Sequence, residues 1–187
     1  MHHCGTQTLE TERLLLRPFL PDDAEAMFRN WASDPEVTKF LTWPPHASVE
    51  VSRAVLAEWV RSYARETFYQ WAIVLKEHGR DPIGSISAVK LDEALSIVHI
   101  GYCIGQSWWH RGIMSEALKA VIGFFFEQVG ANRVESIHDP RNPHSGLVMQ
   151  KCGMHYEGTL RSSARNNQGL CDACWYSLLK AEWENMK

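Results

Sequence analysis

The chain has no hydrophobic run long enough to span a membrane and no excess of positive charge. No apolar stretch approaches the roughly 18–20 residues that a membrane helix needs, and residues 1–5 contain no apolar core of a secretory signal. Lysine and arginine number 19 against 22 aspartates and glutamates, which gives a net charge of -3. We therefore expect a soluble, cytoplasmic protein that binds neither membranes nor nucleic acid in general.

Cysteine is scarce, and its spacing predicts neither a disulfide framework nor a metal site. The chain has five cysteines, an odd number, and a single CxxC pair formed by Cys171 and Cys174. Structural zinc takes more ligands than one such pair supplies, and alternate positions of a strand point to opposite faces, which would separate these two thiols. We expect reduced thiols and no bound metal, and a thiol-redox or zinc protein is the less favoured alternative.

Internal repeats and low-complexity linkers are also absent, so no domain boundary is marked. The length of 187 residues and the hydrophobic content of 45% suit one globular domain with a sizeable core. We expect a single domain over residues 1–187, with residues 1–11 forming a loose N-terminal segment.

Hydrophobic periodicity predicts an α/β (α+β) fold, in which about four helices cover a central sheet. The strongest prediction is the helix over residues 112–128, where apolar side chains recur every three or four residues. The other predicted helices cover residues 21–33, 48–66 and 142–152. The predicted strands cover residues 14–18, 70–75, 83–89, 95–104, 133–137, 154–161 and 170–179.

The start of the 112–128 helix is the most informative part of the chain. An apolar strand, residues 97–104, leads into the basic turn His110-Arg111-Gly112, which opens the helix. The first N–H groups of a helix have no partner within it, and the helix dipole places positive charge at the same end. Such a turn binds an anion, most often a phosphate. The alternative is a glycine in an ordinary strand-to-helix turn.

Three motifs in a fixed order carry a resemblance to a known family: residues 100–102, residues 110–117, and residues 142–145 followed by 151–154. On these motifs the chain resembles the GCN5-related N-acetyltransferases (GNAT), and within them the ribosomal-protein N-terminal acetyltransferases of the RimJ/RimL-like type. The resemblance implies a single GNAT-like domain with a mixed, mostly antiparallel sheet and splayed central strands. It also implies acetyl-coenzyme A (acetyl-CoA) as co-substrate.

The family's pyrophosphate loop reads Gln/Arg-x-x-Gly-x-Gly/Ala. Here the central Gly112 is kept, whereas Trp109 and Met114 depart from the pattern at its two ends. The resemblance implies cofactor contacts from the strand residues Gly101, Tyr102, Cys103 and Ile104, from the loop residues His110, Arg111, Gly112, Ile113, Met114 and Ser115, and from Asn142 and Ser145. The alternatives are that Tyr102 and Ile104 are core residues and that Asn142 only caps its helix.

Two residues are candidates for the chemistry of transfer. The resemblance implies that Ser145 lies near the thioester sulfur and protonates the leaving thiolate, because the tyrosine acid of many relatives is replaced here by Met149. His99 stands where related sequences often carry a glutamate, and a neutral imidazole suits a general base that takes the proton of the amine. A core histidine is an equally good interpretation of His99.

The acceptor side is predicted from aromatic residues. Five aromatic residues would either form an apolar substrate pocket or belong to the core. The first candidates are Trp43 and Trp71, and the others are Trp31, Phe40 and Tyr69. Glu157 is a second candidate near the acceptor, with a structural role as its alternative.

The predicted function is an acetyl-CoA-dependent N-acetyltransferase. No Ser-His-Asp or Cys-His set is apparent, which favours direct transfer over a covalent acyl-enzyme. The acceptor would be a protein N-terminal α-amine or a small-molecule amine, and exposed aromatic residues would permit a homodimer. The alternative is a non-catalytic module that senses acyl-CoA.

Overall fold

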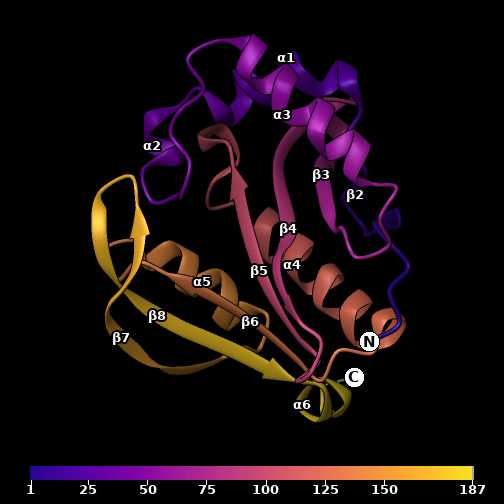
Figure 1. Cartoon of the computed structure of the whole chain (residues 1–187), viewed down its shortest axis with the longest axis vertical. Coiled ribbons are helices and arrows are strands. Elements are labelled where there is room, and N and C mark those ends of the chain that lie inside the picture. The colour runs from indigo at the N-terminus through magenta and orange to yellow at the C-terminus, as the bar shows by residue number, and fades with distance from the viewer. Residues whose placement is uncertain (187) are drawn as a thin grey trace.

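The computed structural model describes residues 1–186 and is built around a mixed sheet of eight strands in the order β1-β2-β3-β4-β5-β6-β8-β7 (Figure 1). The strands are β1 (Leu9–Glu10), β2 (Leu14–Arg17), β3 (Gln70–Leu75), β4 (Pro82–Asp92), β5 (Ile97–Ile104), β6 (Arg133–His138), β7 (His155–Asn166) and β8 (Gly169–Leu179). Neighbouring strands are antiparallel except for β5 and β6, which run parallel. The predicted mixed, mostly antiparallel sheet is confirmed.

The parallel strands β5 and β6 separate after a short register. Residues 97–99 of β5 pair with residues 133–135 of β6, whereas β5 stays paired with β4 along its whole length. Just beyond this register, the Ser136 hydroxyl donates a 2.7 Å hydrogen bond to the carbonyl oxygen of Ile100. Figure 1 shows the two strands diverging from there. The edge of β5 that faces β6 is therefore uncovered from residue 101 onward, and the predicted splayed central strands are confirmed.

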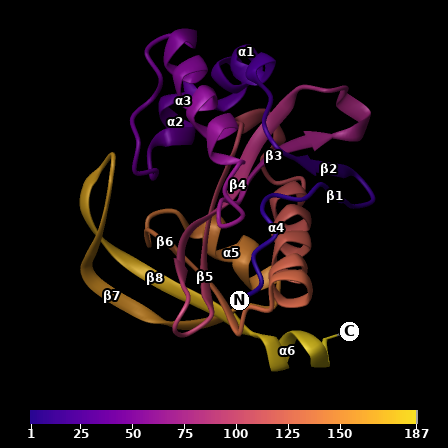
Figure 2. The ribbon, with the colours of Figure 1, turned by 45° about the vertical axis from the view of Figure 1, so that its right-hand side comes forward.

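Helices cover both faces of the sheet (Figures 1 and 2). Within residues 1–186 the six α-helices are α1 (Ala24–Met27), α2 (Pro35–Thr38), α3 (Val49–Ser62), α4 (Ile113–Phe124), α5 (Pro143–Lys151) and α6 (Lys180–Asn185). The apolar side of α4 packs on β2 and β5, and α5 packs on β6, β7 and β8. A second core cluster joins α1 and α3 to Ala72, whose neighbours Trp71 and Ile73 belong to the cluster under α4. Because strand side chains alternate, the two clusters lie on opposite faces.

The structure has six helices where about four were predicted, because α2 and α6 are short. Asp34 and Pro35 follow the end of the helix predicted over residues 21–33. They also begin the next one, since the Asp34 carboxylate accepts a 2.9 Å hydrogen bond from the Glu36 N–H and proline suits the first helical position. Helix α6 follows β8 directly and buries Trp183, which packs over Gly123 of α4.

The N-terminal segment is ordered against the core, so the expectation of a loose segment over residues 1–11 is wrong. The N–H of His2 donates to the Val129 carbonyl oxygen, and the N–H of Gly5 donates to that of Glu66, both over 2.8 Å. The indole N–H of Trp71 donates to the Gln7 carbonyl oxygen over 2.6 Å. The physical reason is that a fully buried Trp71 needs an acceptor for its N–H, and this segment supplies it. Among the described residues, no helix is long and apolar enough to cross a membrane.

Candidate active site

A pocket opens where the N-termini of α4 and α5 meet the second half of β5, and α2 forms its far wall. Ten of the twelve residues predicted to bind a cofactor line this pocket: Tyr102, Cys103, Ile104, His110, Gly112, Ile113, Met114, Ser115, Asn142 and Ser145. The other two, Gly101 and Arg111, do not line it. Three motifs far apart in the sequence therefore meet around one space.

The loop before α4 presents unpaired N–H groups to the pocket. His110 and Gly112 have left-handed backbone angles, with φ of 59° and 73°, and the glycine adopts this conformation without strain. The first intrahelical bond runs from the Glu116 N–H to the Gly112 carbonyl oxygen over 3.1 Å. The N–H groups between them, in residues 113–115, have no partner within the helix. Such N–H groups and the helix dipole favour an anion at this part of the pocket wall.

The start of α5 forms the opposite wall. Asn142 precedes Pro143 at this helix terminus, but its side chain makes no capping hydrogen bond. The alternative that Asn142 serves only as a helix cap is therefore not supported by its geometry. Asn142 lines the pocket. The imidazole rings of His110 and His144 meet edge to face across the mouth, with centroids 4.6 Å apart.

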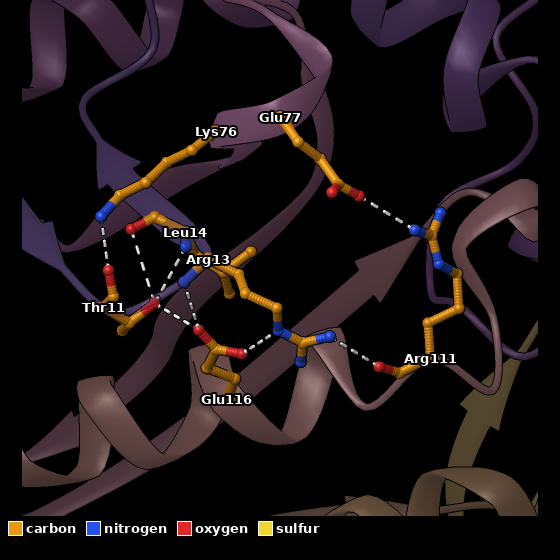
Figure 3. A network of polar contacts seen from close by, with 7 residues as sticks. All are labelled: Thr11, Arg13, Leu14, Lys76, Glu77, Arg111 and Glu116. Atoms are coloured by element: carbon orange, nitrogen blue, oxygen red, sulfur yellow. Dashed lines mark hydrogen bonds and ion pairs between the residues drawn. The ribbon is translucent and has the colours of Figure 1, made fainter.

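Arg111 is held outside the pocket. Its guanidinium forms a 3.1 Å ion pair with Glu77, and its carbonyl oxygen accepts a 3.1 Å hydrogen bond from Arg13 (Figure 3). The side chains of Arg111 and Glu77 are both largely exposed, so this ion pair is weak.

Two hydroxyl groups meet beside the uncovered edge of β5. The Tyr102 hydroxyl donates to the Ser145 carbonyl oxygen over 3.0 Å and lies 3.1 Å from the Ser145 Oγ. Burial raises the pKa of Tyr102 far above its usual range, so this hydroxyl stays neutral. The resemblance predicted a main-chain role for Tyr102, with a core role as the alternative, and did not predict this contact. The only sequence signal for this contact is the position of Tyr102 in the alternation of β5, which places its side chain on the face that α5 covers. Met149, which stands where many relatives have a tyrosine acid, is fully buried.

His99 lies on the other face of β5. It is an odd-numbered position of the strand, whereas Tyr102 is an even one, so the two side chains point to opposite faces. Its Nδ1 lies 3.3 Å from the Glu135 carboxylate, and its ring contacts Trp175 edge to face. Burial lowers the pKa of His99, and the Glu135 contact opposes that shift. Gly101, two residues further on the same face, has no side chain of its own, and the Val89 side chain of β4 lies over it.

Of the three predicted acceptor residues, none lines the pocket. The prediction for Trp71 is wrong, because its ring is fully buried on the α4 face against Phe124 and Phe125. Trp43 is partly exposed in the loop between α2 and α3, with its ring beside His46. Of the wider aromatic group, Trp31 and Tyr69 are core residues and Phe40 lines the pocket.

Glu157 belongs to an ion-pair network that leads to His99. Its carboxylate forms a 2.9 Å ion pair with Arg133 and accepts a hydrogen bond from the Ser177 hydroxyl. Arg133 in turn forms a 3.1 Å ion pair with Glu135, the partner of His99. Glu157 is therefore engaged by the protein itself, in agreement with the structural alternative.

The hairpin of β7 and β8 closes the α2 side of the site. At its tip, the Asn167 N–H donates to the Leu41 carbonyl oxygen over 3.1 Å. The Asn167 side-chain amide donates to the carbonyl oxygens of Thr38 and Trp43 over 2.8 and 2.7 Å. Leu41 lines the pocket, so the hairpin fixes part of its wall. Among residues 1–186, no group of three or more His, Cys, Asp or Glu side chains could hold a metal ion.

Comparisons with known proteins all match the chain to acetyltransferases. Residues 13–155 match the family model described as the acetyltransferase (GNAT) domain. The chain is 32% identical over 178 residues to the uncharacterized N-acetyltransferase p20 of Bacillus licheniformis, covering 95% of this chain and 98% of the relative.

Two solved structures share the fold. One is the ribosomal-protein-S5-alanine acetyltransferase from Vibrio fischeri, with a TM-score of 0.82, 20% identity, and coverage of 95% of this chain and 98% of the other. The second is the microcin C7 self-immunity acetyltransferase MccE in complex with acetyl-CoA and AMP, with a TM-score of 0.80, 19% identity, and coverage of 90% and 93%.

Proposed function

The chain belongs to the GNAT acetyltransferase family, and on that premise we propose that it transfers an acetyl group from acetyl-CoA directly to a primary amine. The single observation that carries the proposal is the pocket. The start of α4, the uncovered edge of β5 and the Ser145–Tyr102 hydroxyl pair all border it. A phosphorylated donor with a long polar arm and a thioester fits this set of groups.

The donor would be bound mainly by backbone groups. The N–H groups of residues 112–115 would bind the pyrophosphate. The free edge of β5 at residues 101–104 would pair with the amide groups of the pantetheine arm, as an added strand does. The Asn142 amide, which makes no capping bond, would bond the same arm. A main-chain N–H of β5 would stabilise the oxyanion formed from the thioester carbonyl.

The chemistry would proceed in one complex that holds donor and acceptor together. The amine nitrogen attacks the thioester carbonyl carbon, and the carbon–sulfur bond of the tetrahedral intermediate then breaks. The nitrogen loses a proton to the Nε2 of His99, directly or through water, while Glu135 holds the Nδ1. Ser145, supported by the Tyr102 hydroxyl, delivers a proton to the departing thiolate. The products are an acetamide and coenzyme A, and solvent then takes the proton from His99 and returns one to Ser145.

For the acceptor, we propose a protein N-terminal α-amine. The support is the fold shared with an acetyltransferase named for alanine of ribosomal protein S5. His99 lies on the face of β5 opposite the Tyr102 side chain, so an amine of either class would approach the point where β5 and β6 separate from that face. A small-molecule amine is the outcome that the acceptor panel below distinguishes.

Binding and turnover are tested separately. Acetyl-CoA at a concentration about 100 times its Kd should stabilise the fold by about 2.7 kcal/mol and raise the melting temperature. Thiol release should then be measured with peptides of varied N-terminal residue, polyamines and amino acids. No shift in melting temperature would overturn the proposal for the donor. A shift without thiol release across the panel would favour an acyl-CoA sensor. Release only with small amines would overturn the peptide acceptor.

A further inference from the structure

We propose that Arg13, from outside the pocket, positions the loop that binds the pyrophosphate of the donor; this inference rests on the function proposed above. Arg13 is distant in sequence from the loop and does not line the pocket. It nevertheless makes the contacts that determine the orientation of the loop backbone. It is therefore a positioning residue rather than a catalytic one.

The contacts of Arg13 converge on the start of α4 (Figure 3). Its Nε donates to Glu116 Oε2 over 2.6 Å, and its Nη1 donates to the Arg111 carbonyl oxygen over 3.1 Å. The other Glu116 oxygen, Oε1, accepts from the Arg13 backbone N–H over 3.0 Å and from the Thr11 hydroxyl over 2.6 Å. Four hydrogen bonds thus join the segment before β2 to one loop and one helical turn.

The bond to the Arg111 carbonyl oxygen determines where the next N–H points. A peptide group is planar and trans, so the carbonyl of Arg111 and the N–H of Gly112 point in opposite directions. Arg13 holds the carbonyl on its own side, and the N–H of Gly112 therefore points away from Arg13. Gly112 lines the pocket and Arg13 does not. The guanidinium thereby selects the peptide orientation that an anion in the pocket requires.

Within residues 1–186, no other hydrogen bond holds the peptide group between Arg111 and Gly112, so its orientation depends on Arg13. His110 and Gly112 both have positive φ, and glycine adopts positive and negative φ with similar ease. The Arg111 side chain is paired with Glu77 on the exposed surface and does not fix the peptide that follows it. Without Arg13, rotation of the peptide between Arg111 and Gly112 would turn the N–H out of the pocket.

Arg13 also offsets a negative charge in the helical turn next to the anion site. Glu116 lies in the first turn of α4, where its charge would repel a bound pyrophosphate. Burial alone would raise the pKa of Glu116, but the hydrogen bonds from Thr11 and Arg13 outweigh burial and lower it, so the group stays ionised. The Arg13 guanidinium, 2.6 Å away, offsets this charge. The pair keeps the carboxylate bonded on the side of the helix where Arg13 lies.

The experiment compares two acetyl donors. Arg13→Gln should raise the KM for acetyl-CoA about tenfold, which corresponds to ~1.4 kcal/mol, while kcat at saturation changes by less than about twofold. The same variant should show no comparable rise in KM with acetyl-pantetheine, which lacks the pyrophosphate. Arg13→Lys should fall between the two, because an ammonium group cannot make both bonds of the guanidinium fork at once. Arg29→Gln, which breaks an exposed ion pair with Asp81, is the matched control.

An unchanged KM for acetyl-CoA in folded Arg13→Gln would overturn the inference, as would an equal rise in KM with both donors. If Arg13→Gln does not fold, Arg13→Lys takes its place, and the two-donor comparison decides in the same way. Failure of this inference is distinguishable from failure of the proposed function. The first leaves wild-type turnover with acetyl-CoA intact, whereas the second abolishes it in the wild type as well.

Discussion

Ser145→Ala should lower turnover with little effect on stability or on donor affinity. The Tyr102 hydroxyl keeps the Ser145 backbone carbonyl as its acceptor, 3.0 Å away, when the serine Oγ is removed. Loss of one neutral hydrogen bond costs about 0.5–1.5 kcal/mol, and at about 2–4 °C per kcal/mol the melting temperature falls by only a few degrees. A positioned general acid contributes about 100-fold or more to rate. We expect kcat to fall about 100-fold, or ~2.7 kcal/mol.

A second substitution tests whether the two hydroxyls act as one unit. Tyr102→Phe alone should lower kcat about tenfold, because Ser145 loses the partner that lies 3.1 Å from its Oγ. In a double-mutant cycle the two changes should not multiply, because groups that act together are non-additive. The double variant should be about as slow as Ser145→Ala.

The assay is the initial rate of thiol release at saturating donor, with the KM for acetyl-CoA measured in parallel. An unchanged kcat in Ser145→Ala would remove this residue from the mechanism. A double variant slower by the product of the two single effects would refute the coupled pair. A rise in KM without a change in kcat would assign Ser145 to donor binding.

Two further predictions concern pH and packing. His99 must be neutral to accept a proton, and burial lowers its pKa from 6.5 while Glu135 opposes that shift, so the acidic limb of kcat/KM should lie below pH 6.5. Glu135→Gln removes the opposing contact and lowers the pKa of His99 further, so the acidic limb should move to lower pH. An acidic limb that does not move would exclude His99 and Glu135 from the proton transfer. Gly105→Ala places a Cβ 2.2 Å from a backbone carbonyl oxygen and 2.8 Å from the Trp108 ring. It should destabilise the fold by about 1–3 kcal/mol in a denaturant titration, and an unchanged midpoint would contradict this.

The parts of the site that sequence predicts are those determined by local chemistry. The loop at Gly112 and the start of α5 at Asn142 are contiguous motifs, and ten of the twelve predicted residues line one pocket. The helix over residues 112–128 has a clear apolar period, and the structure continues it to Val129. Helices α2 and α6 have four and six residues, which is too short for a period to be recognised.

The parts that sequence misses depend on partners far along the chain. Strand β3 is buried at all six positions, so no alternation reveals which face Trp71 occupies. The Tyr102 hydroxyl meets Ser145, which lies 43 residues away. Glu157 meets Arg133 across 24 residues. No local sequence pattern predicts such pairings, because they form only when distant segments pack together in the folded chain.

The three hydrogen bonds of Asn167 have a consequence for the binding equilibria of the two substrates. They tie the tip of the β7–β8 hairpin to the carbonyl oxygens of Thr38, Leu41 and Trp43, and Leu41 belongs to the wall of the donor pocket. An acceptor that displaces the hairpin must therefore displace that wall, and a donor that fixes the wall also fixes the hairpin. Because such coupling is equal in both directions, each substrate should change the dissociation constant of the other by the same factor. Weakening the Asn167 tie should bring that factor closer to one.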